Sequence, residues 1–145
     1  MFNKETEYAL KSLVYIQSRN NENSRPGIAE ISNETGAPQF FIGKILQRLV
    51  RQGFLESVKG KGGGFYFDGS KPEVRLLDLV RSIEGARTFE GCIFGLKQCN
   101  ENNPCPLHNR FVEIRDGMLK LLREETIQSL ALKLDNEKIH FNWLG

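Results

Sequence analysis

Apolar positions in the first third of the chain recur every three or four residues, which is the period of an amphipathic helix. No helix breaker interrupts this pattern between residues 4 and 17, where a first helix is predicted to bury Tyr8, Ala9, Leu13 and Ile16. A polar stretch ending in Pro and Gly follows and predicts a loop. A second, shorter helix is predicted from Ile28 to Thr35, because Gly36 can take the left-handed conformation in which many helices end.

The third predicted helix begins at Pro38, whose missing N–H suits a first helical position, and runs to Gln52. Its expected buried side consists of Phe41, Ile45, Leu46, Leu49 and Val50. Its opposite side is polar and cationic, with Gln39, Gly43, Lys44, Gln47, Arg48 and Arg51. Two short helices joined by a tight turn are typical of a helix-turn-helix, whose second helix enters the major groove of DNA.

A glycine-rich turn between two aromatic strands follows these helices. Strands are predicted from Phe54 to Val58 and from Phe65 to Phe67, and the turn between them contains four glycines with Lys59 and Lys61. The turn lacks the Gly-Lys-Ser or Gly-Lys-Thr ending of a nucleotide-binding loop. A simple hairpin turn needs only one or two glycines, so Gly62 and Gly63 are predicted to let the backbone approach DNA. The order of elements predicts a mainly α fold with a small β-hairpin wing, that is, a winged helix-turn-helix.

The second half of the chain has a different pattern. A helix is predicted around Leu76, Leu79, Val80 and Ile83 and ends before Gly85, so residues 1–85 are expected to be the DNA-binding domain. Residues 86–105 are rich in Gly, Asn and Pro without an apolar period, which predicts an irregular loop. Beyond it, spacings of four and three residues predict the seam of a coiled-coil dimer formed by Leu107, Phe111, Ile114, Met118 and Leu121. Packing of this helix on its own domain explains the pattern equally well.

Residues 106–145 are accordingly expected to form a long C-terminal dimerisation helix and a tail. Thr126 is the expected cap of a last short helix through Leu134, and no role is predicted for Ile139 to Gly145.

Composition and charge narrow the classes of function. The 145-residue chain has neither a signal peptide nor an apolar run near the roughly 20 residues of a membrane span, so a cytoplasmic protein without membrane contact is expected. Residues 1–89 hold 13 basic and 10 acidic side chains, whereas residues 90–145 hold 7 and 8, so the positive excess lies with the predicted helix-turn-helix. The chain offers no pairing of nucleophile and base, so an enzyme is not expected.

Candidate DNA contacts follow from the helix-turn-helix geometry. The first turn of the third predicted helix would lie nearest the base edges, with Gln39, Phe40, Gly43 and Lys44. Gln can pair with adenine and Lys with guanine, whereas phosphate contacts are expected of Arg48, Arg51, Lys59 and Lys61. A solvated polar face explains the same helix residues without DNA.

The three cysteines of the chain all lie in the predicted loop. Cys92, Cys99, Cys105 and His108 have the spacing C-x6-C-x5-C-x2-H. In a reducing compartment, three cysteines are more typical of a metal site than of disulfides. The C-x2-C or C-x4-C hook of most zinc sites is missing, and widely spaced thiolates with one histidine favour an iron–sulfur cluster. The alternative role of His108 is simply to begin the long helix.

Together these features resemble the Rrf2 family of bacterial transcription regulators. The resemblance rests on Glu7-Tyr8-Ala9-Leu10, Ile28-Ala29-Glu30, Arg48-Leu49, Ser57-Val58-Lys59-Gly60 with the glycines after it, Leu76-Leu77-Asp78 and the three cysteines. It implies a homodimer that pairs through the long helix, reads a palindromic operator in double-stranded DNA and holds a 2Fe–2S cluster, with 4Fe–4S as the alternative. The implied function is a repressor whose operator affinity follows redox state, nitric oxide or cluster supply.

The chain departs from the family pattern in two places. Its first gap between cysteines is six residues where cluster-binding members usually have five, and Gly43 stands where they often have Glu. In some members a carboxylate from the first helix of the other subunit is the fourth ligand, and Glu7 occupies the matching position. Glu7 of the partner subunit and His108 are therefore rival ligands. The alternatives are a cluster-free or zinc-binding winged-helix regulator and, less favoured because of the basic wing, an iron–sulfur electron carrier.

Overall fold

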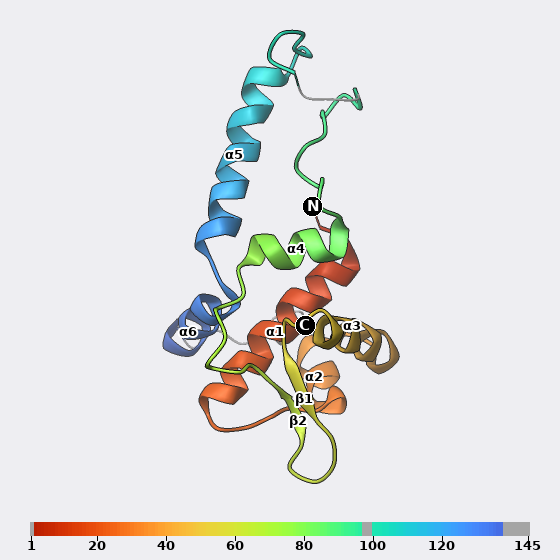
Figure 1. Cartoon of the computed structure of the whole chain (residues 1–145), viewed down its shortest axis with the longest axis vertical. Helices are drawn as coiled ribbons and strands as arrows, with labels where there is room; N and C mark the ends of the chain where they lie inside the picture. The colour runs from red at the N-terminus through yellow and green to blue at the C-terminus, as the bar shows by residue number, and fades with distance from the viewer. Residues whose placement is uncertain (1, 97–99, 138–145) are drawn as a thin grey trace. The chain divides into compact units, whose positions relative to one another are not determined.

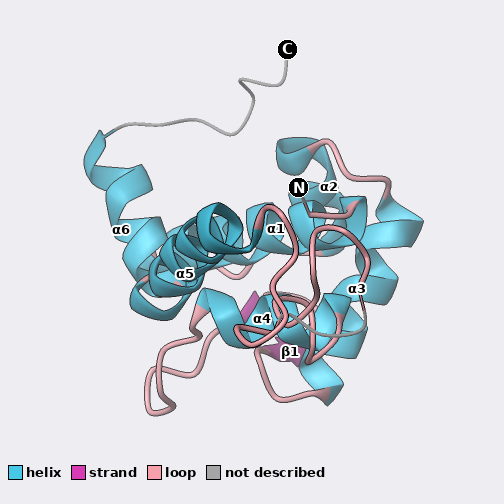
Figure 2. Ribbon diagram, turned by 90° about the horizontal axis from the view of Figure 1, so that it is seen from above, coloured by secondary structure: helices cyan, strands magenta, loops and turns pink. Residues whose placement is uncertain are grey.

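The structure, a computed structural model, describes residues 2–96 and 100–137 of the chain (Figure 1). These residues form six helices and one two-stranded antiparallel hairpin, shown by type in Figure 2. The predicted mainly α fold with a small hairpin is confirmed. The chain divides into two compact units, of which unit 1 comprises residues 1–74 with 126–145 and unit 2 comprises residues 75–125.

Unit 1 begins with the three predicted helices, α1 (Lys4–Asn21), α2 (Ile28–Thr35) and α3 (Gln39–Arg51). Asn3 caps α1, because its Oδ1 accepts hydrogen bonds from the backbone N–H and the hydroxyl of Thr6 at 2.8 and 2.9 Å. α2 has the predicted bounds and ends at Gly36, whose φ is 75°. α3 begins one residue later than predicted, because Pro38 has an extended ψ of 135° and is the N-cap residue.

The core of unit 1 forms where α1 contacts α2 and α3. Its fully or almost fully buried side chains include Ala9, Leu13, Ile16, Ile31, Ile42, Ile45, Leu46 and Leu49. The predicted buried side of α3 was therefore wrong at Phe41, because Ile42 is completely buried whereas Phe41 is 37% exposed, and Val50 is only half-buried. Phe41 instead meets Tyr8 of α1 edge to face, with ring centroids 5.7 Å apart.

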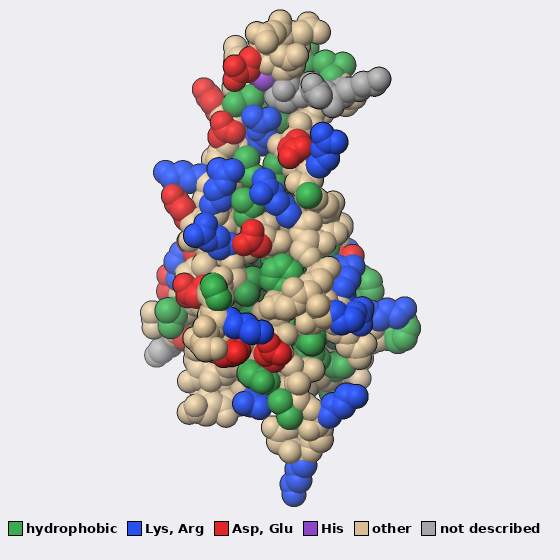
Figure 3. All heavy atoms as spheres, in the orientation of Figure 1, with side chains coloured by type: hydrophobic (Ala, Val, Ile, Leu, Met, Phe, Trp, Pro, Cys, Tyr) green, Lys and Arg blue, Asp and Glu red, His purple; other side chains and the backbone are tan. Residues whose placement is uncertain are grey.

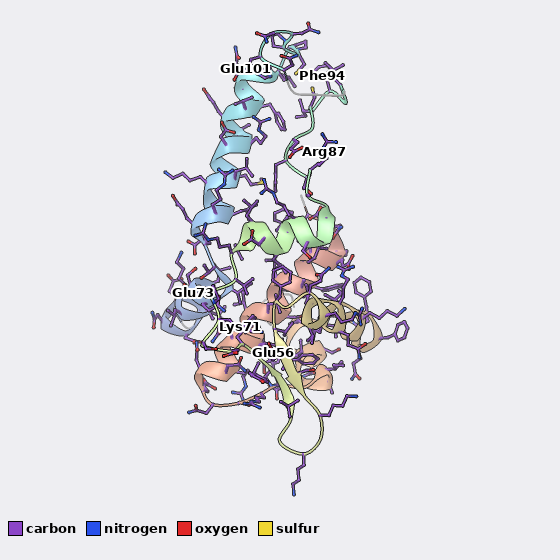
Figure 4. All side chains as sticks on the ribbon, viewed as in Figure 1. Glu56, Lys71, Glu73, Arg87, Phe94 and Glu101 are labelled. Carbon is purple, nitrogen blue, oxygen red and sulfur yellow. The ribbon has the colours of Figure 1, made fainter. Side chains whose placement is uncertain are left out.

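The wing consists of strands β1 (Glu56–Val58) and β2 (Gly64–Tyr66) and the turn between them. The strands pair antiparallel with Ser57 opposite Phe65. Asn20 of α1 holds β2, since its side chain donates to the carbonyl of Phe65 at 3.2 Å and accepts from the N–H of Phe67 at 2.9 Å. Lys71 and Glu56 form an ion pair at the base of the wing (Figure 4). The wing is thus fixed to unit 1 at its base while its turn projects.

The last described helix, α6 (Ile127–Glu137), packs along α1 (Figure 1). Ile127 and Ala131 are completely buried, and Thr126 caps the helix by accepting from the N–H of Ser129 at 2.9 Å, as predicted. The chain returns to unit 1 beside the point where it left, because the N–H of Ile127 donates to the carbonyl of Val74 at 2.8 Å. Long-range packing on α1 thus places α6 in unit 1.

Unit 2 contains α4 (Leu76–Glu84) and α5 (His108–Glu124), which contact each other. α4 ends before Gly85, as predicted, and the N–H of Leu76 donates to the carbonyl of Glu125 at 3.1 Å, which joins the two ends of the unit. The residues between α4 and α5, where they are described, form turns without regular secondary structure. Within residues 2–96 and 100–137, no helix combines the length and apolarity needed to cross a bilayer.

Candidate nucleic-acid interface and cysteine site

The outward face of α3 begins with an aromatic side chain and a cation that contact each other. Phe40 is 77% exposed, and the Nζ of Lys44 lies 4.4 Å from the centroid of its ring. Gln39, at the start of the helix, is also exposed. These three predicted base-reading residues therefore lie on the solvent side of α3, where a second molecule can reach them.

Gly43 does not belong to this face. It is buried, and a Cβ atom built at its position would lie 3.4 Å from the Cδ1 of Ile28 in α2. Gly43 therefore lies on the side of α3 that packs toward α2, and an added Cβ would meet Ile28 only at ordinary van der Waals distance. The signal in the sequence was its position directly after the buried Ile42.

The two arginines of α3 differ in their surroundings. The Nη2 of Arg48 lies 2.5 Å from the Oε1 of Glu5 in α1, so the charge of this guanidinium is paired within the chain. Arg51, one turn beyond Gln47, is exposed. A shallow cavity of 440 Å³ lies along this side of the helix and is lined by Glu5, Phe41, Lys44, Ile45, Gln47, Arg48 and Arg51. Sequence reasoning missed Glu5, because the two partners lie on different helices.

The wing carries Lys59 and Lys61, both exposed, and Figure 3 shows cationic side chains at the tip of the hairpin. The backbone of the turn itself explains why glycines occur there. Gly62 has a φ of 77°, and a Cβ atom on Gly63 would lie 2.2 Å from the carbonyl oxygen of Val58. The turn therefore requires glycine at both positions whether or not DNA lies nearby, and their contact with DNA stays a prediction.

One further cation lies beside the wing and was missed by the sequence analysis. The guanidinium carbon of Arg25, in the loop before α2, lies 4.0 Å from the ring centroid of Tyr66 in β2. Both residues help to line a polar cavity of 250 Å³, together with Asn20, Asn23, Ser24 and Phe67. The Arg-Pro-Gly sequence before α2 is the signal that could have found this cation.

In unit 2 the structure brings two of the predicted metal ligands together. The N–H of Phe94 donates to the Sγ of Cys92 at 3.4 Å, and the thiols of Cys92 and Cys105 share a hydrogen bond. The hydrogen bond from Phe94, and to a lesser extent the one with Cys105, lowers the pKa of the Cys92 thiol below its usual value. His108 is buried at the start of α5, and its backbone N–H donates to the backbone carbonyl of Cys105 at 3.0 Å. Cys99 lies outside the described residues.

Two neighbouring thiols suit a metal site but do not complete one. Among the described residues, no group of three His, Cys, Asp or Glu side chains is close enough to hold a metal ion. Cys92 and Cys105 fit two thiolate ligands of a cluster, and a full set would draw on Cys99 and a fourth residue. The rival carboxylate, Glu7, is 40% exposed in α1 and lies 3.3 Å from the Nζ of Lys4, so a second chain can reach it.

The predicted seam of α5 is uncovered in the single chain. Ile114 is 66% exposed and Leu121 is 54% exposed, Leu107 is also exposed, and Phe111 and Met118 are half-buried. Burial of these side chains would release free energy whether the helix packs on its own domain or on a second copy, so both alternatives stay predictions.

Comparison with known proteins identifies the family. Residues 2–133 match the family model Rrf2, described as an iron-dependent transcriptional regulator. The chain belongs to the Rrf2 family. Among curated relatives of this Rrf2 protein, an HTH-type transcriptional regulator of Aquifex aeolicus is 26% identical over 132 residues, which are 90% of each chain. Protein aau3 of Rhizobium meliloti is 30% identical over 129 residues, which are 88% of this chain and 82% of the relative.

Solved structures show the same fold. The global cysteine regulator CymR of B. subtilis has a TM-score of 0.73 at 19% identity, covering 92% of this chain and 97% of its own. IscR of T. potens has a TM-score of 0.68 at 13% identity, covering 96% of this chain and 90% of its own. The Rrf2 protein is thus a DNA-binding transcriptional regulator by family, with a winged helix-turn-helix fold.

Proposed function

We propose that this Rrf2 protein is a homodimeric repressor that binds double-stranded operator DNA and whose affinity depends on an iron–sulfur cluster. α3 would contact the bases through Gln39, Phe40 and Lys44. The phosphates would be contacted by Arg51, Lys59 and Lys61. The observation that carries the proposal is that these side chains are exposed on two elements of one unit, α3 and the wing. Cations there gain affinity by releasing counterions from the phosphates.

The homodimer is supported by the uncovered apolar side of α5. A helix in water gains free energy when Ile114, Leu121 and their neighbours leave solvent, and a second copy offers a matching apolar side. Two copies related by a two-fold axis would place two α3 helices for a palindromic operator.

The cluster is supported by the neighbouring thiols of Cys92 and Cys105 and by the family's iron dependence. Cys99 and either His108 or Glu7 of the partner subunit would complete the ligands of a 2Fe–2S or 4Fe–4S cluster. Residues 86–105 have few apolar side chains to bury, so bonds to a cluster would supply the free energy that orders them. The competing form is a cluster-free or zinc-binding regulator, because a structural neighbour is named as a cysteine regulator.

Protein purified without oxygen tests the cofactor directly. A cluster gives a brown protein with visible absorbance, whereas zinc gives a colourless one. We expect Cys92→Ala, Cys99→Ala and Cys105→Ala each to abolish the absorbance while helical circular dichroism stays unchanged. Colourless wild-type protein that contains zinc, or no metal, would establish the competing form.

The fourth ligand is tested by comparing His108→Ala with Glu7→Ala. The true ligand should change the visible spectrum, and the other variant should keep the wild-type spectrum. Operator binding is then measured with and without the cluster. Equal affinities would remove the sensing role and leave a DNA-binding dimer.

A further inference from the structure

Phe40 is the most exposed large apolar side chain of the described residues, at 77%. Leaving a large aromatic ring in water forgoes the free energy that its burial would release. It stands on α3, whose other large apolar residues are mostly buried, and Phe41 beside it already contacts Tyr8. An exposed ring at the start of this helix is therefore available to a second molecule.

The chemistry around the ring indicates what that molecule is. Lys44, one turn along α3, places its ammonium 4.4 Å from the ring centroid, and Arg51 lies further along the same helix. The wing of the same unit adds Lys59 and Lys61. An apolar group surrounded by cations complements a polyanion that also offers an apolar contact. DNA is such a polyanion, because its major groove exposes the methyl groups of thymine.

We infer that Phe40 and Lys44 together read a thymine beside a guanine in the major groove. The ring would contact the C5-methyl group of thymine, which other bases lack, and the ammonium would donate to N7 of guanine. This inference rests on the proposed function, because it assumes that α3 enters the major groove. It adds the bases that the helix selects.

The geometry of the pair suits neighbouring base pairs. The separation of 4.4 Å between the ammonium and the ring centre is comparable with the distance of about 3.4 Å between successive base pairs. Contact between Lys44 and the ring already restricts both side chains in the free protein. Each therefore loses less conformational entropy when DNA binds. A thymine and a guanine one step apart are therefore the expected signature in each half-site.

The first experiment selects bound sequences from a library of random DNA duplexes with the full-length wild-type protein. Selected half-sites should contain the thymine–guanine step. Selection with Phe40→Ala should lose the preference for thymine at that position and keep preferences elsewhere. Selection with Lys44→Met should lose the preference for guanine.

The second experiment changes single atoms of the selected duplex. Uracil in place of that thymine removes only the methyl group, and we expect about a fourfold loss of wild-type affinity per half-site, as for one buried methyl group. Phe40→Ala should bind the uracil and thymine duplexes equally. 7-Deazaguanine should likewise weaken the wild type but not Lys44→Met. Together these measurements form double-mutant cycles between protein and DNA.

Two controls separate base reading from general loss of affinity. Arg51→Ala, on the same helix, should lower affinity for the thymine and uracil duplexes by the same factor, because a phosphate contact carries no base identity. Uracil at a thymine outside the selected step should leave wild-type affinity unchanged.

Three results would overturn the inference. Equal wild-type affinity for the thymine and uracil duplexes would exclude the methyl contact. If Phe40→Ala selected the same sequence as the wild type, the ring would not read thymine and would instead serve another partner, such as a protein. Failure of the wild type to bind any duplex would instead overturn the proposed function itself.

Discussion

The guanidinium of Arg48 is paired with a carboxylate on another helix, which leaves less of its charge for a phosphate. Its guanidinium lies 2.5 Å from the Glu5 carboxylate, so a side chain predicted to meet phosphate is already paired. The glycines of the wing illustrate the same dependence, because Gly63 is required by the carbonyl of Val58. Such roles follow from tertiary neighbours, and residue type and spacing alone do not reveal them.

We predict that Glu5→Gln strengthens DNA binding. The substitution removes a negative charge beside α3 and releases Arg48 for a phosphate, so the slope of affinity against salt should steepen by about one. Binding titrations at several salt concentrations measure both quantities. Glu22→Gln is the matched control, because Glu22 pairs with Arg19 at the other end of α1. Unchanged affinity and slope in Glu5→Gln would show that Arg48 makes no phosphate contact.

Gly63→Ala is expected to destabilise the wing. The added methyl group would meet the carbonyl oxygen of Val58 at 2.2 Å and that of Gly60 at 2.9 Å, and relief of this overlap should cost about 1–3 kcal/mol of stability. Thermal unfolding followed by circular dichroism gives the difference. Gly69→Ala is the control, since a Cβ atom at Gly69 has no neighbour within 4 Å. Equal stability of both variants would mean that the turn shifts at little cost.

Among the elements, those with a clear period were the most predictable. The bounds of α2 agree with the prediction because a glycine ends it in the left-handed conformation. The buried face of α3 was harder to predict from the sequence. Ile42 and Phe41 are both apolar, and only packing on α1 decides which of them is buried. The candidate metal site was predicted only as a set of residues. The thiols of Cys92 and Cys105 lie together, but a loop without an apolar period contains no signal for its conformation.

The apolar side of α5 predicts the behaviour of a double substitution. Ile114→Glu together with Met118→Glu should convert a dimer into monomers, because the charges would otherwise be buried without partners. Sedimentation velocity measures the change. Lys120→Glu, which introduces a glutamate at an exposed position off the predicted seam, should keep the dimer. A dimer that survives the double substitution would place the interface elsewhere on the protein.

At the scale of the whole molecule, unit 1 is discontinuous in sequence. The hydroxyl of Ser18 in α1 donates to Asp135 in α6, a contact between residues 117 apart. The periodicity of α6 predicted a helix, but no local pattern indicated that it completes unit 1. Contacts over such separations are decided by the tertiary fold.

Ile127→Ala tests the contribution of α6. Ile127 is completely buried, so its truncation should reduce the free energy of unfolding by about 2–5 kcal/mol. Leu132→Ala is the control on the same helix, because Leu132 is 56% exposed and its truncation should change stability little. Urea unfolding of both variants provides the comparison. Similar losses in the two would indicate that α6 packs differently from the structure.

Because the chain returns to unit 1 beside Val74, synthesis on the ribosome completes unit 1 only after unit 2 has been made. α1, α2, α3 and the wing are synthesised first, but their unit lacks α6 until residues 75–125 have been made. At typical rates of synthesis this interval is roughly three to ten seconds. The cysteines and α5 therefore emerge before α6 completes unit 1. Under the proposed function, a nascent chain would thus have time to acquire a cluster before unit 1 is complete.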